Sequence, residues 1–208
     1  MILRTLVNRY RLAKLKQLFL RCAEFKNIDT VTFFVGASIY LFGDSNKSDI
    51  QIGDNCLIYG TVASENHGKI KIGEYCSIGA GTKIRCVDSI VIGAYTAISY
   101  NVVIADNNSH PVNPHDRLIM RVTPPGSLER RWVNSDHAPI IIGRNCWIGE
   151  NARICKGVTI GDGSIVAANT VVTKSVPANC IVAGNPGRIV KTDIDTGTEQ
   201  KFRTDDLL

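Results

Sequence analysis

The sequence lacks the features of several large protein classes. No window of about 18 consecutive apolar residues occurs in its 208 residues, so we expect no membrane-spanning helix. The seven cysteines are odd in number and include no Cys-x-x-Cys pair, which disfavours a secreted disulfide framework and favours a reducing, cytoplasmic compartment. The first residues also lack the uninterrupted apolar core of a secretory signal, because basic residues recur every few positions.

Positive charge is concentrated at one end of the chain. The formal net charge is +5, but residues 1–27 contain seven Lys or Arg and only one acid. That segment alone therefore carries +6, and the other 181 residues sum to −1. A nucleic-acid-binding protein usually spreads positive charge over a binding face, so we expect no nucleic-acid partner.

The body of the sequence contains a six-residue repeat. Ile or Val recurs without a break at positions 142, 148, 154, 160, 166 and 172, and the same register occurs upstream from Ile52. The third residue after each is often Asn or Gly, which tolerate a left-handed corner, and the fourth is small. Neither a helical period nor simple alternation makes three kinds of residue (the Ile or Val, the Asn or Gly, and the small residue) recur together every six positions. Short strands stacked in a parallel β-solenoid do. The strands of a β-sandwich, the alternative, keep no such phase.

The repeat divides the chain into three parts. Residues 1–27 are expected to contain a short basic amphipathic helix, because apolar residues between 2 and 22 follow one helical face. Residues 28–191 would form the solenoid, residues 105–138 a loop without regular structure extruded from it, and residues 192–208 a polar tail. The helix would cap the open end of the solenoid, pack on a neighbouring subunit or rest on an anionic membrane surface, and these roles do not exclude one another.

Four stretches of the C-terminal half carry a more specific signal. Residues 138–149 read APIIIGRNCWIG, and KGVTIGDGS, VVTKSVP and VAGNPGRIVK follow at 156–164, 171–177 and 182–191. Over residues 50–191 the chain resembles the hexapeptide-repeat acyltransferases of the galactoside and maltose O-acetyltransferase branch, most of all the bacterial polysaccharide O-acetyltransferases. The resemblance implies an all-β fold, a left-handed parallel β-helix, in a homotrimer that uses acetyl-CoA as co-substrate and requires no metal.

The resemblance also implies which residues bind coenzyme A. Small side chains would let the thin pantetheine arm approach the coils, and cations near the last coil would meet the phosphates. The candidate positions are Trp147, Gly149, Ala167, Ala168, Thr173, Lys174, Asn185, Arg188 and Lys191.

The extruded loop interrupts the repeat with DNNSHPVNPHDR at residues 106–117. In the resembled family, a histidine immediately before a proline, here His110, takes the proton of the acceptor hydroxyl as the oxygen attacks the acetyl carbonyl. His115 and His137 are weaker candidates, expected at solvated loop positions. Four polar residues in or beside the loop are candidates for contact with the acceptor, the last two also for orienting His110: Arg85, Asp88, Asp106 and Asn108.

These observations predict an acetyl-CoA-dependent O-acetyltransferase that modifies a sugar hydroxyl in bacterial surface-polysaccharide synthesis. The carbohydrate acceptor would be free, nucleotide-linked, polymeric or lipid-linked, and a lipid-linked acceptor would place the enzyme at the inner face of the membrane. One alternative is a zinc enzyme like the γ-class carbonic anhydrases, with His67, His110 and His115 as ligands. An antibiotic-modifying acetyltransferase and a non-enzymatic scaffold are the others.

Overall fold

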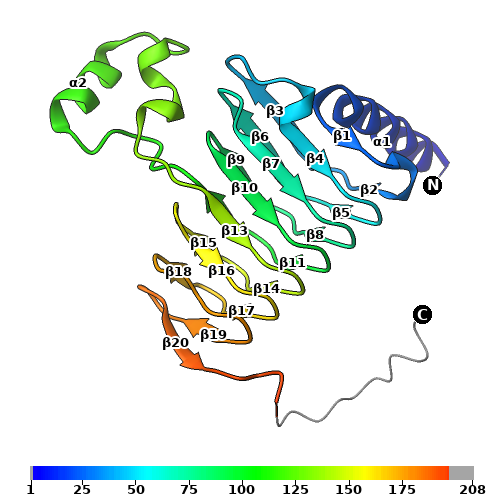
Figure 1. Cartoon of the computed structure of the whole chain (residues 1–208). Coiled ribbons are helices and arrows are strands. Elements are labelled where there is room, and N and C mark those ends of the chain that lie inside the picture. The colour runs from blue at the N-terminus through cyan, green and yellow to red at the C-terminus, as the bar shows by residue number, and fades with distance from the viewer. Residues whose placement is uncertain (1, 197–208) are drawn as a thin grey trace.

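The computed structural model describes residues 2–196, and side chains from Val7 onward. Helix α1 (Ile2–Cys22) lies where the sequence predicts a helix, and it is followed by a column of stacked coils (Figure 1). The first sheet already begins at Glu24, within the segment assigned to the helical region. The predicted polar tail beyond residue 196 lies outside the described residues.

Strands of successive coils pair in parallel and form three sheets, so the chain is the predicted left-handed parallel β-helix. The first sheet contains β1 (Glu24–Phe25), β4 (Ile50–Ile52), β7 (Lys69–Ile72), β10 (Ser89–Ile92), β13 (Ile140–Ile142) and β16 (Thr159–Ile160). The second contains β2 (Thr32–Phe33), β5 (Leu57–Ile58), β8 (Ser77–Ile78), β11 (Ala97–Ile98), β14 (Trp147–Ile148), β17 (Ile165–Val166), β19 (Ile181–Ala183) and the antiparallel β20 (Arg188–Lys191). The third contains β3 (Ser38–Phe42), β6 (Thr61–Glu65), β9 (Lys83–Cys86), β12 (Val103–Ala105), β15 (Arg153–Ile154) and β18 (Val171–Val172).

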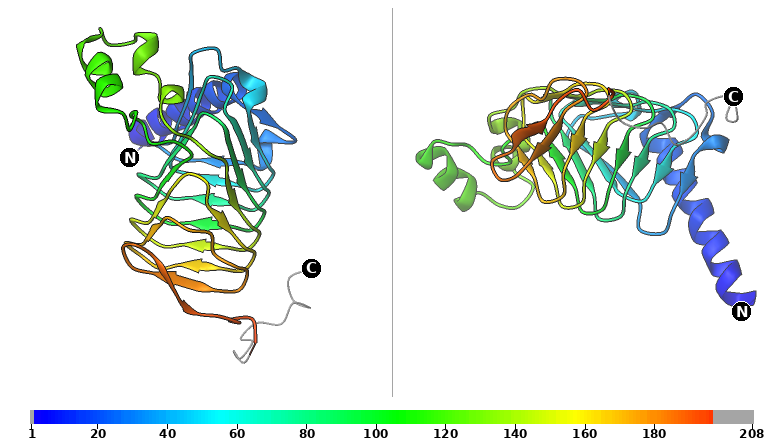
Figure 2. Two further views of the ribbon diagram at one scale, coloured as in Figure 1. Left: turned by 60° about the vertical axis from the view of Figure 1, so that its left-hand side comes forward. Right: turned by 90° about the horizontal axis from the view of Figure 1, so that it is seen from below.

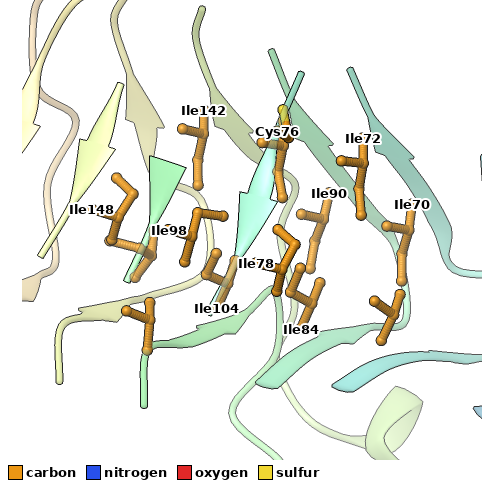
Figure 3. Packing of buried hydrophobic residues seen from close by; sticks show 14 of the residues in the cluster. Ile70, Ile72, Cys76, Ile78, Ile84, Ile90, Ile98, Ile104, Ile142 and Ile148 are labelled. Atoms are coloured by element: carbon orange, nitrogen blue, oxygen red, sulfur yellow. The ribbon is translucent and has the colours of Figure 1, made fainter. Parts of the chain in front are cut away.

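Equivalent isoleucines stack on one another inside the solenoid. In the second sheet the register aligns Ile78 with Ile98 and Ile98 with Ile148, and each is at most 2% exposed (Figure 3). Burial of each such side chain stabilises the fold by about 1.5–3 kcal/mol. Three cysteines that occupy the small fourth position of the repeat are likewise buried: Cys56, Cys76 and Cys146.

The corners of the coils adopt left-handed backbone conformations where the repeat predicts them. The torsion φ lies between +52° and +75° at eight Asn and Gly residues that stand third after an Ile or Val of the repeat: Asn55, Gly81, Asn101, Asn145, Asn151, Gly157, Gly163 and Asn169. The same conformation occurs at Tyr75 and Tyr95, with φ of +55° and +64°. The sequence pattern missed these two because bulky residues rarely adopt it.

Helix α1 covers the N-terminal end of the solenoid, as one of its predicted roles requires. Phe19 is fully buried, and its ring centroid lies 4.4 Å from that of Phe33. Phe33 in turn contacts Phe25 edge to face. The N-terminal half of the helix projects beyond the coils (Figure 2), and Tyr10 there is 61% exposed.

The extruded segment between β12 and β13 is not the irregular loop that the sequence predicted. It contains helix α2 (Pro114–Val122) and two 3₁₀ turns, η3 (Leu128–Arg130) and η4 (Trp132–Asn134). Asn113 caps α2 by accepting the N–H of His115, and proline occupies the first helical position, both favourable at a helix start. Two further 3₁₀ turns lie near the N-terminal end, η1 (Ile28–Thr30) and η2 (Lys47–Asp49).

Candidate active site

The extruded segment leaves the solenoid through a narrow two-stranded neck, formed by residues 105–108 and 136–138. Asn107 forms an antiparallel bridge with His137, and the Asn108 N–H donates to the Asp136 carbonyl at 3.0 Å. The Ala138 N–H donates to the Asp106 carbonyl at 2.9 Å. The neck brings the ends of the segment together and projects α2 away from the coils (Figure 1).

His110 lies just beyond the neck and is exposed. Its Nδ1 is 3.2 Å from Sδ of Met120, the one buried residue of α2. A thioether sulfur can only accept a hydrogen bond, so this contact favours the tautomer with the proton on Nδ1. The lone pair of Nε2 is then available, which is what a general base requires.

Asp106 does not fit the predicted contact with an acceptor or with His110. Its side chain is completely buried, and the carboxylate accepts the backbone N–H groups of Val87 at 3.0 Å and Asp88 at 2.8 Å. The Asn107 amide and the Cys86 thiol also donate to it. The carboxylate therefore holds the corner of the preceding coil, at Val87 and Asp88 between β9 and β10.

Two other candidates for contact with the acceptor already interact with the extruded segment. The guanidinium carbon of Arg85 lies 5.7 Å from the ring centroid of Trp132. Asp88 Oδ2 lies 3.5 Å from Nδ1 of His137, so His137 is not the purely solvated histidine that we expected. About a third of the Asp88 side chain remains exposed, and Asn108 is exposed. Asp88 and Asn108 are therefore still accessible to an acceptor.

The predicted coenzyme A residues begin on the second sheet. Trp147 is 55% exposed on β14, and its indole N–H donates to Ser99 Oγ at 3.3 Å. Ala168 is exposed and Ala167 is half-buried at the corner that follows β17. These three residues present an accessible surface to a ligand.

Gly149 has a different role from the predicted one. It is buried, and a Cβ atom at this position would lie 2.6 Å from the Ala168 nitrogen and 2.7 Å from the Val166 oxygen. The backbone that approaches this glycine is that of the next coil, so its small size serves coil stacking and not contact with the pantetheine arm.

The last coil brings together two of the predicted cations. A hollow of about 240 Å³ is lined by Lys174, Ser175, Val176, Val182, Gly187, Arg188 and Ile189. Thr173 and Lys191 are exposed beside it, and Asn185 precedes Pro186 through a cis peptide bond. Two positive charges at one hollow match the charge of a phosphate group, so these residues fit the phosphate end of coenzyme A.

The predicted residues do not form one site within a single chain. The extruded segment stands beside the N-terminal coils, whereas β18 and β20, which flank the cationic hollow, close the opposite end of the solenoid (Figures 1 and 2). The zinc alternative is not supported by a set of ligands. Among the described residues, 2–196, no three His, Cys, Asp or Glu side chains lie close enough together to hold a metal ion. His67 instead contacts Asp49, with Nδ1 3.2 Å from Oδ2.

Two further residues connect the extruded segment to the solenoid, and the sequence analysis missed both. The backbone N–H of Trp132 donates to the carboxylate of Glu65, which is only 7% exposed. The sequence hinted at this contact only through the types of the two residues, since Trp132 is an apolar residue in a polar segment and Glu65 is an acid at the end of an apolar strand.

Comparison with known proteins agrees with this architecture. A family model described as the hexapeptide repeat of succinyl-transferase matches residues 139–174. The chain is 30% identical over 146 residues to the putative colanic acid biosynthesis acetyltransferase WcaF of Escherichia coli K12, covering 70% of this chain and 71% of the relative. It is also 30% identical over 148 residues to the putative lipopolysaccharide biosynthesis O-acetyl transferase WbbJ of the same strain, covering 70% and 73%.

A solved structure shows the same fold. A point mutant of AntD, an N-acyltransferase from Bacillus cereus crystallised with a nucleotide-linked amino sugar and coenzyme A, superposes with a TM-score of 0.64 at 22% identity. The match covers 86% of this chain and 88% of AntD. From the stacked hexapeptide coils and from the extent of its identity to WcaF and WbbJ, we conclude that the chain belongs to the hexapeptide-repeat acetyltransferase family.

Proposed function

We propose that this acetyltransferase moves the acetyl group of acetyl-CoA to a sugar hydroxyl during the synthesis of a bacterial surface polysaccharide. The observation that carries the proposal is the 30% identity, over 70% of the chain, to proteins named for colanic acid and lipopolysaccharide synthesis. The cationic hollow of the last coil supports a phosphate-bearing donor.

His110 is the proposed general base. A sugar hydroxyl is a weak nucleophile, and removal of its proton by Nε2 makes the oxygen able to attack the acetyl carbonyl. The carbon–sulfur bond of the thioester then breaks, and the coenzyme A thiolate leaves and takes the proton from His110. The contact with Met120 leaves that nitrogen free to accept the proton. Bound acetyl-CoA supplies an activated acetyl group, and Lys174 and Arg188 pair with its phosphates.

The test is acetyl transfer to a panel of sugar acceptors. The change His110→Ala is expected to lower kcat by about 10²- to 10⁴-fold, the usual contribution of a general base. The matched control is His115→Ala, an exposed histidine of the same segment, which should keep its activity. Full kcat in the His110 variant would remove the base assignment.

Binding of the donor is tested without any acceptor. Acetyl-CoA at about 100 times its Kd should stabilise the protein by roughly 2.7 kcal/mol, seen as a rise of the thermal midpoint. Lys174→Ala should shrink this rise, and Lys156→Ala, which lies at the equivalent corner one coil earlier, should not. No rise with the unaltered chain would contradict the proposed donor.

The proposed assembly is a homotrimer. The spread of the candidate residues along one chain supports it, because a neighbouring solenoid would bring the extruded segment of one subunit to the donor surface of the next. Light scattering of the purified protein should give a molar mass three times that of one chain.

The N-terminal half of α1 is proposed to rest on an anionic membrane surface, next to a lipid-linked acceptor. Within residues 2–196 no helix has the length and apolar character needed to cross a bilayer. Exposed Arg9, Arg11 and Lys14 would meet anionic headgroups, and changing all three to Gln should weaken binding to phosphatidylserine vesicles on the order of 100-fold. Changing Lys47, Lys71 and Lys83 to Gln is the charge-matched control, and equal binding by the two triple variants would remove the membrane role.

A further inference from the structure

The second half of the extruded segment lies against the third sheet of the solenoid. The Trp132 ring meets Phe42 of β3 edge to face, with centroids 5.7 Å apart, and Arg85 of β9 lies over it at 5.7 Å. Ala63 and Ala105 point outward by strand alternation and yet are only 3% and 2% exposed. Their burial is expected where another segment covers the strands.

A buried carboxylate lies at the centre of this contact. Glu65 ends β6 on the outward face, and its Oε2 accepts the backbone N–H of Trp132. Burial raises the pKa of Glu65, although the N–H groups of Trp132 and Val133 and the charge of Arg131 oppose this effect. A carboxylate placed in so unfavourable an environment points to a specific use, and the acetyl-transfer chemistry does not use it.

Hydrogen bonds connect the region around Trp132 to helix α2, and α2 contacts His110. Arg130 Nε donates to the Thr123 carbonyl at 2.8 Å, and its Nη2 donates to the Arg121 carbonyl at 3.0 Å. Both carbonyls lie at the C-terminal end of α2, and Met120 of that helix touches the His110 ring. The neck fixes only the ends of the segment, so the position of α2 depends on this second attachment.

We propose that Glu65 is a positioning residue for acetyl transfer: by holding Trp132 against the third sheet, it places α2 and thereby His110. This inference rests on the proposed function for the role of His110. The anchor itself, defined as Glu65 with Trp132, can be measured without any substrate.

The experiment compares Glu65→Ala with Glu65→Gln, and Glu74→Ala, an exposed glutamate of the solenoid, is the control. Limited trypsin digestion followed by mass spectrometry reports cleavage after Arg130 and Arg131, next to the anchor. Steady-state kinetics report kcat and KM for acetyl-CoA separately. The digestion needs no activity, so loss of the anchor and failure of the proposed function are distinguishable.

Glu65→Ala should speed cleavage at these arginines and lower kcat roughly 10- to 100-fold, because a small misplacement of a catalytic group has effects of that size. The KM for acetyl-CoA should stay unchanged, and Glu65→Gln should restore most of kcat, since its amide oxygen still accepts the Trp132 N–H. Unchanged cleavage, an unchanged kcat, or a Gln variant as impaired as the Ala variant would overturn the proposal. If Glu65→Ala does not fold, Trp132→Leu gives the same test, with lower kcat at an unchanged KM expected and full kcat overturning it.

Discussion

At the scale of single residues, the buried carboxylate of Asp106 holds the corner of the preceding coil, at Val87 and Asp88. Its carboxylate accepts two backbone N–H groups, and removing it would leave the N–H of buried Val87 and that of half-buried Asp88 without this acceptor. We expect Asp106→Ala to lower the free energy of unfolding by about 3 kcal/mol, measured by urea denaturation. Asn108→Ala, an exposed neighbour, should change it by less than about 0.5 kcal/mol. Equal stability of the two variants would show that the hydrogen bonds of Asp106 contribute little.

Asp49 provides the residue-scale prediction for pH. Burial alone would raise its pKa, but hydrogen bonds from Lys69, the Asn46 N–H and His67 outweigh burial and hold the pKa below its usual range. A lowered pKa in the folded state stabilises the fold at pH values above the ordinary value of about 3.9, and this stabilisation is lost as the pH falls through the folded-state value. The thermal midpoint of the unaltered chain should therefore exceed that of Asp49→Asn at neutral pH, and the difference should shrink below about pH 4. A difference that grows in acid would contradict this assignment.

At the scale of the structural element, coil spacing is set where backbones meet at the corners. A Cβ atom at Gly149 would lie 2.6 Å from the backbone of the next coil, so Gly149→Ala must push two coils apart. We expect a loss of about 1–3 kcal/mol in unfolding free energy, together with weaker acetyl-CoA binding because Ala168 moves with its coil. Unchanged stability with weaker binding would instead support the original expectation that this glycine faces the ligand.

The structural elements differ in how well the sequence predicted them. The short α2 begins at an Asn-Pro cap inside a polar, proline-rich stretch, so its signal is weaker than that of the six-residue repeat. The repeat, by contrast, predicted the left-handed corners at eight positions because each coil imposes the same backbone geometry.

At the scale of the whole molecule, the separation of the two halves of the site leads to a test of subunit mixing. His110→Ala should have little activity alone, and so should Lys174→Ala when acetyl-CoA is kept well below the Kd of that variant. If each site uses the extruded segment of one subunit and the cationic hollow of the next, random mixing in a trimer should restore about a quarter of the sites. Unfolding the two variants together, refolding them and measuring acetyl transfer checks this. Activity no higher than that of either variant refolded alone would mean that both residues act within one chain.

The sequence by itself determined the solenoid and its register, because a six-residue period places the same residue type at the same corner of every coil. The motifs of the C-terminal half indicated the family through their resemblance to known members. It also indicated Lys174 and Arg188 as cations near the last coil, and the structure shows that both line one hollow. Only the tertiary structure decided the roles of Asp106 and Glu65. Their partners come from another coil or from the extruded segment, and these single contacts are not repeated from coil to coil, so they leave no periodic trace in the sequence.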